Sequence, residues 1–290
     1  MDSLTERKAI DSGFAQARRI TREYARIFYF SSKFLSKAER DAAYAIYVVC
    51  RDSDEAVDNM KLSPKQEHLS RVKENIAAVY NGSSIKENTL LAFREAVNKF
   101  KIPQEYFYEL IEGMQMDLDK NRYRNFQELY RYCYKVAGVI GLIMLKVFGS
   151  KENEAEKYAV DLGLAMQLTN ILRDIKEDWE KGRIYLPQEE MQSYGIIEEN
   201  IVRAKIDDNF KRLMKFQIQR ARGYYISSLK GLEFIPSRRL RFVTLSMLKM
   251  YSAILDKIER GGFDVFSKRL YISGPRKLFI VLQNLFRVWK

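Results

Sequence analysis

The chain has 290 residues, of which 47% are hydrophobic and 30% are charged, and its 50 lysines and arginines against 38 acidic residues give a net charge of +12. This composition excludes an intrinsically disordered chain and supplies enough apolar side chains for a large core. Two cysteines, Cys50 and Cys133, favour buried, reduced thiols over a disulfide framework. The first ten residues lack an apolar signal core, and the longest apolar stretch, 136–147, is too short to span a bilayer. We therefore expect a soluble, cytoplasmic protein.

Five prolines and clusters of turn residues divide the chain into segments with the apolar spacing of helices. Strand-like alternation is scarce, residues 182–195 are expected to form an ordered loop, and no linker composition interrupts the chain. The sequence therefore predicts an all-α fold with one domain over residues 1–290. The predicted helices cover residues 3–27, 37–60, 64–80, 85–100, 103–119, 126–148, 152–178, 198–230, 237–260 and 275–289.

A first acidic segment lies near the end of the predicted helix 37–60. Asp54 and Asp58 are four residues apart, so on a helix they share one face about one turn apart. On its own, such a pair is typical of a solvated helix face, with the neighbouring Arg51 in local salt bridges. The pair indicates a metal site only in combination with the second acidic segment.

The second acidic segment ends the predicted helix 152–178. Asn170, Asp174 and Asp178 repeat every four residues and fall within an arc of about 80° at 3.6 residues per turn. The apolar residues between them are Ile171, Leu172 and Ile175. These should bury an adjacent face, so the polar row borders the core. Because unpaired charge beside a core is costly, bound cations are expected to compensate it.

Together the two segments predict a site for divalent metal and diphosphate. Each helix presents oxygen ligands only, and no histidine or cysteine cluster competes with them. Mg²⁺, with Mn²⁺ as the alternative ion, binds one or two carboxylates together with phosphate oxygens. Arg51 and Arg173 lie beside the acids in the sequence and are expected to hold phosphate oxygens.

With these motifs in this order, the chain resembles the squalene/phytoene synthase family from about residue 24 to residue 278. The resemblance implies an all-α isoprenoid synthase fold around a central cavity. It further implies a catalytic set that consists of Asp54, Asp58, Tyr132, Asp174 and Asp178. The four aspartates of this set, together with Asn170, would hold Mg²⁺ and the diphosphates. The stretches that carry the resemblance are 44–51, 54–58, 113–118, 132–138, 170–178, 182–187 and 266–269.

The resemblance also implies a set of substrate-binding residues. These residues are Phe28, Tyr47, Arg51, Gln167, Asn170, Tyr251 and Arg269. Arg173 joins them because of its place beside Asp174. Ser32 joins them because it is four residues after Phe28, where a small side chain on the same helix face favours a deeper pocket.

The activity implied is head-to-head condensation of two geranylgeranyl diphosphates to phytoene, through the cyclopropylcarbinyl intermediate prephytoene diphosphate and with loss of both diphosphates. Ser32 favours this longer substrate, and residues 113–118 and 267–269 look like those of phytoene synthases. NADPH is not expected, because phytoene formation needs no reduction. Isoprenyl diphosphates are thus the expected partners.

Three alternatives remain open. Condensation of two farnesyl diphosphates to presqualene diphosphate, squalene or dehydrosqualene keeps the same fold and metals. A catalytically inactive assembly factor of the same fold is disfavoured, because all four aspartates are present. A basic helical membrane-binding protein would explain the end of the chain but not two acidic rows beside a core.

The end of the chain is basic and apolar. No acidic residue occurs from Val265 to Lys290, and Leu278, Leu282, Leu285 and Trp289 share one helical face. Such a helix either packs on the protein body or lies on anionic lipid, so peripheral membrane contact is one expectation. Nucleic-acid binding is not expected, because no recognised motif supports it.

Overall fold

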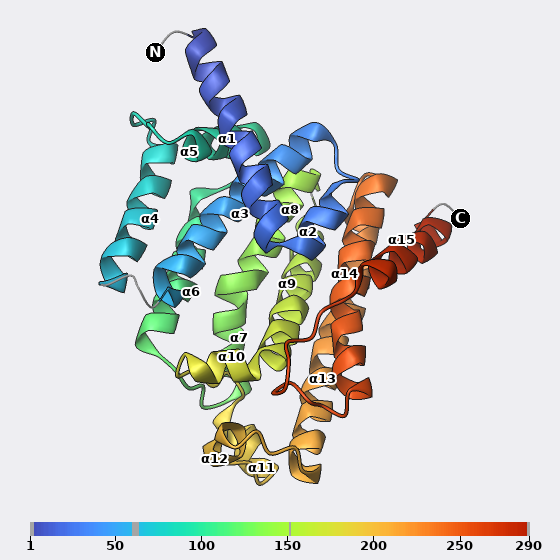
Figure 1. Cartoon of the computed structure of the whole chain (residues 1–290). Coiled ribbons are helices and arrows are strands. Elements are labelled where there is room, and N and C mark those ends of the chain that lie inside the picture. Colours follow the sequence, from blue (N-terminus) through green and yellow to red (C-terminus); the bar gives the residue numbers. More distant parts are fainter. Residues whose placement is uncertain (1–2, 60–63, 151, 289–290) are drawn as a thin grey trace.

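The computed structural model describes residues 3–59, 64–150 and 152–288, and every regular element in them is helical (Figure 1). The predicted all-α fold is confirmed. The elements are α1 (Ser3–Tyr24), α2 (Arg26–Ser32), α3 (Lys37–Asp58), α4 (Lys65–Tyr80), α5 (Asn88–Phe100), α6 (Gln104–Asp119), α7 (Phe126–Cys133), the π-helical turn η1 (Tyr134–Gly138), α8 (Val139–Phe148), α9 (Glu154–Arg173), α10 (Ile175–Glu180), α11 (Gln188–Ser193), α12 (Glu198–Val202), α13 (Asp208–Lys230), the 3₁₀ turn η2 (Gly231–Phe234), α14 (Arg238–Arg260) and α15 (Gly274–Val288).

Four of the predicted helices are interrupted. The first breaks at Ala25 between α1 and α2, and the helix expected at 152–178 breaks at Asp174 between α9 and α10. A π-helical turn separates α7 from α8, and residues 203–207 separate α12 from α13. The expected loop 182–195 contains the short helix α11. The expected helix ends at residues 60 and 289 lie outside the described residues.

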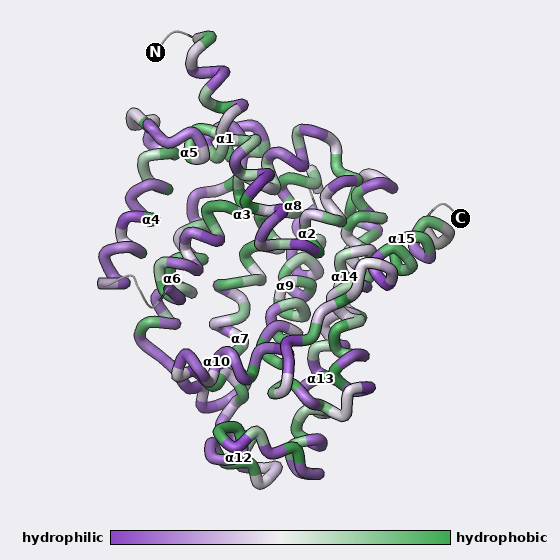
Figure 2. The backbone as a smooth tube through the Cα atoms, in the orientation of Figure 1, coloured by the Kyte–Doolittle hydropathy of each residue, from purple (hydrophilic) through white to green (hydrophobic). Residues whose placement is uncertain are grey.

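Helix α9 runs through the middle of the bundle and packs against α8, α13 and α14 (Figure 1). It buries residues on several sides, as expected of a central helix. In Figure 2 hydrophobic residues gather along the interior stretches of the bundle, while α4 at its edge carries many hydrophilic ones. The amphipathic outer helices therefore enclose an apolar interior.

The two central helices approach each other closely at Gly141 of α8. A Cβ atom there would lie 2.1 Å from the carbonyl oxygen of Ala159 in α9. Any side chain larger than hydrogen would push the two backbones apart. The structure thus shows that Gly141 permits close packing of α8 on α9.

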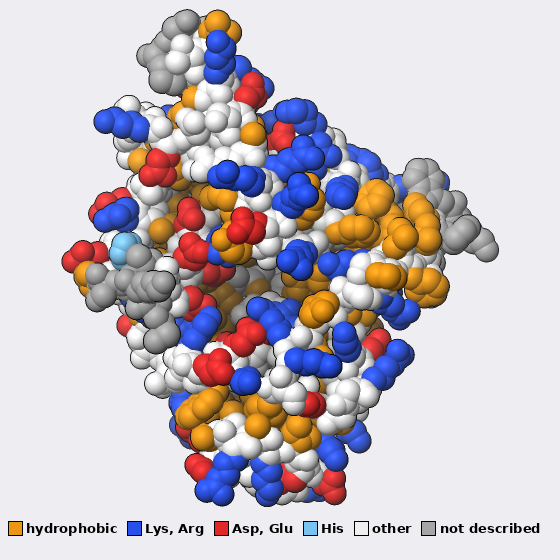
Figure 3. Space-filling view, viewed as in Figure 1, with side chains coloured by type: hydrophobic (Ala, Val, Ile, Leu, Met, Phe, Trp, Pro, Cys, Tyr) orange, Lys and Arg blue, Asp and Glu red, His pale blue; other side chains and the backbone are white. Residues whose placement is uncertain are grey.

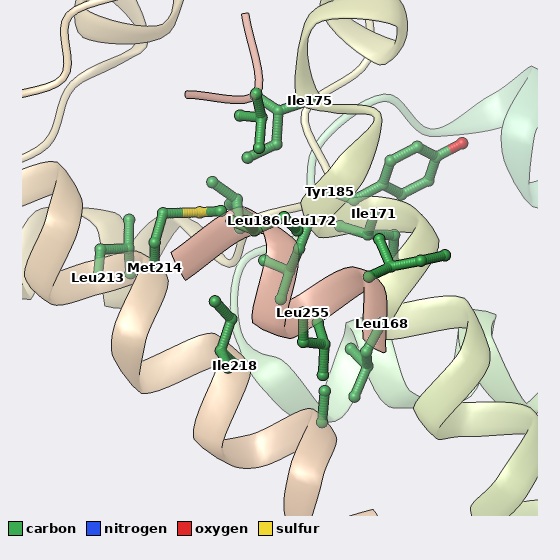
Figure 4. Close-up of a cluster of buried hydrophobic side chains, with 14 of the residues drawn as sticks. Leu168, Ile171, Leu172, Ile175, Tyr185, Leu186, Leu213, Met214, Ile218 and Leu255 are labelled. Atoms are coloured by element: carbon green, nitrogen blue, oxygen red, sulfur yellow. The ribbon is translucent and has the colours of Figure 1, made fainter. Parts of the chain in front are cut away.

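The apolar residues of the second acidic segment are buried, as predicted from their spacing. Figure 4 shows Ile171, Leu172 and Ile175 together with side chains of α13 and α14, including Met214 and Leu255. Each of the three is no more than 5% exposed. This packing fixes the rotation of α9 and α10, and so determines where the polar residues between these side chains point.

Candidate active site

A cavity of about 320 Å³ lies inside the bundle, and side chains of α2, α3, α6, η1, α8, α9, α13, η2 and α14 line it. Its lining is polar at one end, where Asp54, Gln167 and Asn170 lie, and mostly apolar elsewhere. Figure 3 shows a hollow near the middle of the displayed face, with acidic and basic side chains at its edge. The geometry combines a charged end with an apolar interior.

Six of the residues expected at the site line this cavity, although they come from widely separated parts of the chain. The rings of Phe28 and Tyr47 lie 6.0 Å apart, between centroids, on the wall formed by α2 and α3. Tyr251 faces the same space from α14. The six are Phe28, Tyr47, Asp54, Gln167, Asn170 and Tyr251.

The remaining acidic residues surround the polar end of the cavity. Asp58 accepts hydrogen bonds from Lys181 and Arg183, each at 2.6 Å. Burial alone would raise the pKa of Asp58, but these two cations outweigh burial and lower it. The loop after α10 therefore holds the carboxylate of α3 in its ionised form.

Asp174 lies between two arginines that were expected at the site. Its Oδ1 accepts a hydrogen bond of 2.7 Å from Nε of Arg173, and its Oδ2 lies 3.0 Å from Nη2 of Arg269. Arg269 also pairs with Glu177 at 3.2 Å. The segment around residue 269 is thus tied to the second acidic motif by charge pairing.

The helix break at Asp174 preserves the spacing of the acidic row. The backbone N–H of Asp174 donates to the carbonyl of Asn170, and that of Asp178 donates to the carbonyl of Asp174, at 2.8 and 2.9 Å. The helical repeat therefore continues through the break, and Asp178 remains at the polar end of the cavity. The predicted row of Asn170, Asp174 and Asp178, which repeats every four residues, is therefore retained although α9 and α10 are separate helices.

Within the described residues, neither Asp54 nor Asp178 forms a salt bridge, because the nearby basic side chains pair with other acids. Burial raises the pKa of Asp178 to about 8, with a further contribution from the charge of Asp174. Asp54 is accessible to solvent in the cavity, yet surrounding protein raises its pKa to about 7, helped by Asp58 and Asp117. Negative charge is therefore under-compensated at the polar end.

Tyr132 is 4% exposed and belongs to a hydrogen-bonded triad. Its hydroxyl donates to Oδ2 of Asp117 at 2.8 Å, and the hydroxyl of Tyr185 donates to Oδ1 at 2.7 Å. The two rings stack, with centroids 5.1 Å apart. Burial, reinforced by the charge of Asp117, raises the pKa of Tyr132 well above its ordinary value, so the hydroxyl keeps its proton.

Arg51 lies on α3 one turn before Asp54 and Glu55. It pairs with Glu55, and its guanidinium carbon lies 3.4 Å from the ring centroid of Tyr24. Tyr24 is itself exposed at the end of α1. The arginine is thus placed at the edge of the acidic region, covered on one side by an aromatic ring.

Ser32 does not face the cavity in this structure. Its hydroxyl is buried and lies 2.7 Å from the hydroxyl of Tyr44, in contact with the carbonyl of Tyr29 at 3.0 Å. The expectation that it shares the cavity wall with Phe28 required a helical turn between the two residues, and α2 supplies that turn. Ser32 is nevertheless the last residue of α2, and its hydroxyl is directed to Tyr44 instead of the cavity.

The polar end has the chemistry of a hard-cation site that is completed by substrate. Among the residues that the structure describes, no three acidic, histidine or cysteine side chains converge closely enough to hold a metal ion. Mg²⁺ commonly uses one or two carboxylates and fills its other positions with water and phosphate oxygens. Separate, under-compensated carboxylates such as Asp54 and Asp178 fit this mode better than a closed protein cage.

Four residues at the polar end were not among the predicted site residues: Asp117, Lys181, Arg183 and Tyr185. A signal for Asp117 exists in the sequence. Leu110, Met114 and Asp117 have helical spacing, and the two apolar residues are buried, which places an acid on an inward face of α6. Arg183 and Tyr185 lie in the stretch 182–187 that carried the family resemblance, but their contacts with α3 and α6 are distant in sequence.

Comparison with known proteins agrees with this arrangement. The family described as "Squalene/phytoene synthase" matches residues 21–276. Phytoene synthase of Arthrospira platensis is 38% identical over 275 residues, covering 90% of this chain and 88% of that protein. Chloroplastic phytoene synthase 2 of Solanum lycopersicum is 40% identical over 263 residues, covering 88% and 84%. A crystal structure of a dehydrosqualene synthase shares the fold, with a TM-score of 0.92 and 24% identity over 98% of this chain and 99% of that one. The chain belongs to the squalene/phytoene synthase family.

Proposed function

We propose that this protein condenses two geranylgeranyl diphosphates head to head to form phytoene. The observation that carries the proposal is a mostly apolar cavity whose polar end is formed by the acidic segments of α3 and α9. Such a cavity suits a substrate with an anionic head and a long hydrocarbon tail. Relatives named phytoene synthases, 38% and 40% identical over most of the chain, support the same activity.

We assign the metal and diphosphate to the polar end. Asp54, Asp58, Asn170, Asp174 and Asp178 would hold Mg²⁺, for which Mn²⁺ is the alternative, in contact with diphosphate oxygens. Bound Mg²⁺ would neutralise the charge that develops on the departing diphosphate. Arg51, Arg173 and Arg269 come from three different segments, and they would hold the remaining phosphate oxygens.

The reaction proceeds in two ionisations. In the first, the carbon–oxygen bond of one substrate breaks, and the allyl cation is attacked by the 2,3 double bond of the other. Loss of one proton closes the cyclopropane of prephytoene diphosphate. In the second, its diphosphate leaves, the carbon skeleton rearranges, and loss of another proton forms the central double bond. Two diphosphates and two protons are released, and no reductant is consumed.

The cavity residues have defined roles in this scheme. The faces of Phe28 and Tyr47 stabilise cationic carbon at roughly 0.5–2 kcal/mol each without offering a nucleophile. The apolar walls exclude water, which would otherwise quench the cation. Tyr132 and Tyr185 keep the carboxylate of Asp117 hydrogen-bonded beside the reacting region, so this acid is held in one position.

Product identification tests the proposal. The purified protein is incubated with Mg²⁺ and either geranylgeranyl or farnesyl diphosphate, without NADPH, and with EDTA in place of Mg²⁺ as the control. A C40 hydrocarbon from the first substrate, lost in EDTA, is the expected result. C30 products from farnesyl diphosphate alone would move the assignment to the squalene branch of the family. No turnover of either substrate would favour an assembly role.

We also propose that α15 lies on an anionic membrane surface. One face of this helix packs on α14 through Ile280 and Val281, while Leu278, Phe279 and Leu282 are each about half exposed. Figure 3 shows hydrophobic side chains gathered over α15 with basic ones beside them. Trp289, expected on this face, lies outside the described residues. No helix in the described part of the chain is long and apolar enough to cross a bilayer.

Vesicle flotation tests the membrane proposal. Vesicles containing phosphatidylglycerol are expected to bind the protein, and neutral phosphatidylcholine vesicles are expected to bind it weakly. The double variant Leu278→Glu/Phe279→Glu should lose binding to the anionic vesicles. Ile226→Glu, which changes an exposed isoleucine on α13, is the matched control and should retain binding. Equal binding by wild type and the double variant would contradict the proposal.

A further inference from the structure

The apolar end of the cavity is built by the ends of three helical segments. Phe148 is the last residue of α8, Ala155 and Tyr158 lie in the first turns of α9, and Gly231 begins η2. The polar residue Asn170 lies at the opposite end of the cavity on α9. One helix therefore connects the diphosphate end to the apolar end.

Tyr158 is fixed in place at this apolar end. Its ring stacks on Phe234 of η2, with centroids 5.7 Å apart and planes 14° from parallel. Gly231 of the same turn approaches so closely that a Cβ atom there would lie 2.5 Å from Cβ of Tyr158. The 3₁₀ turn thus backs the tyrosine from outside, and the ring has little freedom to move outward.

The length of α9 between these ends can be compared with prenyl chains. Asn170 and Tyr158 are twelve residues apart, which at 1.5 Å per residue is roughly 18 Å. With an advance of roughly 1.25 Å per carbon–carbon bond, the main chain of a farnesyl group is roughly 14 Å long, a geranylgeranyl group roughly 19 Å and a geranylfarnesyl group roughly 24 Å. The geranylgeranyl group is the one whose length matches.

We propose that Tyr158, backed by Phe234 and Gly231, is the floor of the prenyl site and sets the upper limit of one substrate chain at C20. The inference rests on the proposed function, because it takes the Asn170 end as the diphosphate end. Tyr158 acts on specificity only. It touches the tail of the substrate, far from the reacting carbons, so its replacement should change which chain is accepted more than how the chain reacts.

Two substitutions with opposite effects on the length of the cavity test whether Tyr158 forms its floor. Tyr158→Ala opens the end of the cavity, and Leu162→Phe fills it one turn closer to Asn170. Wild type and variants are given equimolar pairs of substrates, C20 with C25 or C20 with C15, and the hydrocarbons are identified by mass. Because one extra group in a pocket changes discrimination by about 10–200-fold, we expect Tyr158→Ala to raise the C45 to C40 ratio by about tenfold. Leu162→Phe should raise the C35 to C40 ratio instead, because a ring one turn nearer the diphosphate end shortens the cavity.

Tyr158→Phe is the matched control, since it keeps the ring and its stacking on Phe234, and its product ratios should equal those of wild type. Unchanged ratios in both Tyr158→Ala and Leu162→Phe, with wild type active on C20, would show that Tyr158 is not the floor. An increase in C35 with Tyr158→Ala would overturn the proposal as well, because it would place Tyr158 elsewhere along the chain.

A binding readout separates this inference from the proposed function. The melting temperature is measured with Mg²⁺ and unreactive thiolodiphosphate analogues of C15, C20 and C25. If wild type forms no C40 product but Tyr158→Ala still shifts the largest stabilisation from C20 to C25, the floor stands and the proposed activity fails. If wild type forms C40 product and the variant shows no shift, the floor fails and the activity stands. If neither is observed, both fail.

Discussion

Replacement of Asp178 by asparagine should stabilise the metal-free protein while it removes a proposed metal ligand. Burial and the charge of Asp174 raise the pKa of Asp178 to about 8. Its pKa in the unfolded chain is about 3.9, so the folded state holds an extra proton between roughly pH 4 and pH 8. The stability of the wild-type protein therefore falls as pH rises through this range, and asparagine removes that dependence.

The size of the effect follows from the pKa shift. Each pKa unit corresponds to about 1.4 kcal/mol, so a shift of about four units sets an upper limit near 6 kcal/mol. Water in the cavity screens much of this cost, because Asp178 is only partly buried. We expect Asp178→Asn to raise the free energy of unfolding by about 1–2 kcal/mol at pH 8.5, and by about half as much at pH 6.

Urea denaturation in EDTA at pH 6 and pH 8.5 measures this difference, and Asp58→Asn is the matched control from the same site. The pKa of Asp58 is lowered by Lys181 and Arg183, so its ionised form stabilises the fold above its unfolded pKa, and this contribution is lost as pH falls through its folded pKa. Asp58→Asn should therefore destabilise the protein at both test values. Destabilisation by Asp178→Asn at pH 8.5 would refute the reasoning.

Three further predictions follow from the geometry. Asp54→Asn should lower kcat by about 10²–10³-fold in saturating Mg²⁺ with an unchanged circular dichroism spectrum, and normal turnover would argue against a metal role. Tyr132→Phe removes a hydroxyl donor from Asp117 and should cost about 1–3 kcal/mol in urea denaturation, whereas no loss would show that the triad is not needed for stability. Gly141→Ala should lower the melting temperature, because its Cβ meets the backbone of α9, while Gly223→Ala, with open space around it, should not; equal effects would contradict this packing.

Much of the fold was accessible from sequence because apolar spacing and prolines mark helices directly. The interruptions of the predicted helices were not accessible in this way. Asp174 fits the helical repeat of its neighbours, and the hydrogen bonds of the row continue through it, so nothing local marks the break. The π-helical turn Tyr134–Gly138 packs against α6 and α9, and local propensity does not report such contacts.

The sequence predicted those features of the candidate site that depend on residues of one helix. The spacing of Asp54 from Asp58, and of Asn170 from Asp178, predicted that each set shares one face of its own helix. The pairing of Asp58 with Arg183 joins residues 125 positions apart, and no periodicity reports such a contact. Ser32 shows the opposite problem, since a spacing argument from Phe28 gave it a cavity position that the structure does not.

The most direct test of the account is a competition between the two candidate substrates. The protein is given equimolar geranylgeranyl and farnesyl diphosphates with Mg²⁺ and without NADPH, and the chain lengths of the hydrocarbons are measured by mass spectrometry. We predict that a C40 hydrocarbon dominates and that EDTA abolishes it. Dominance of a C30 product, or formation of no hydrocarbon, would contradict it.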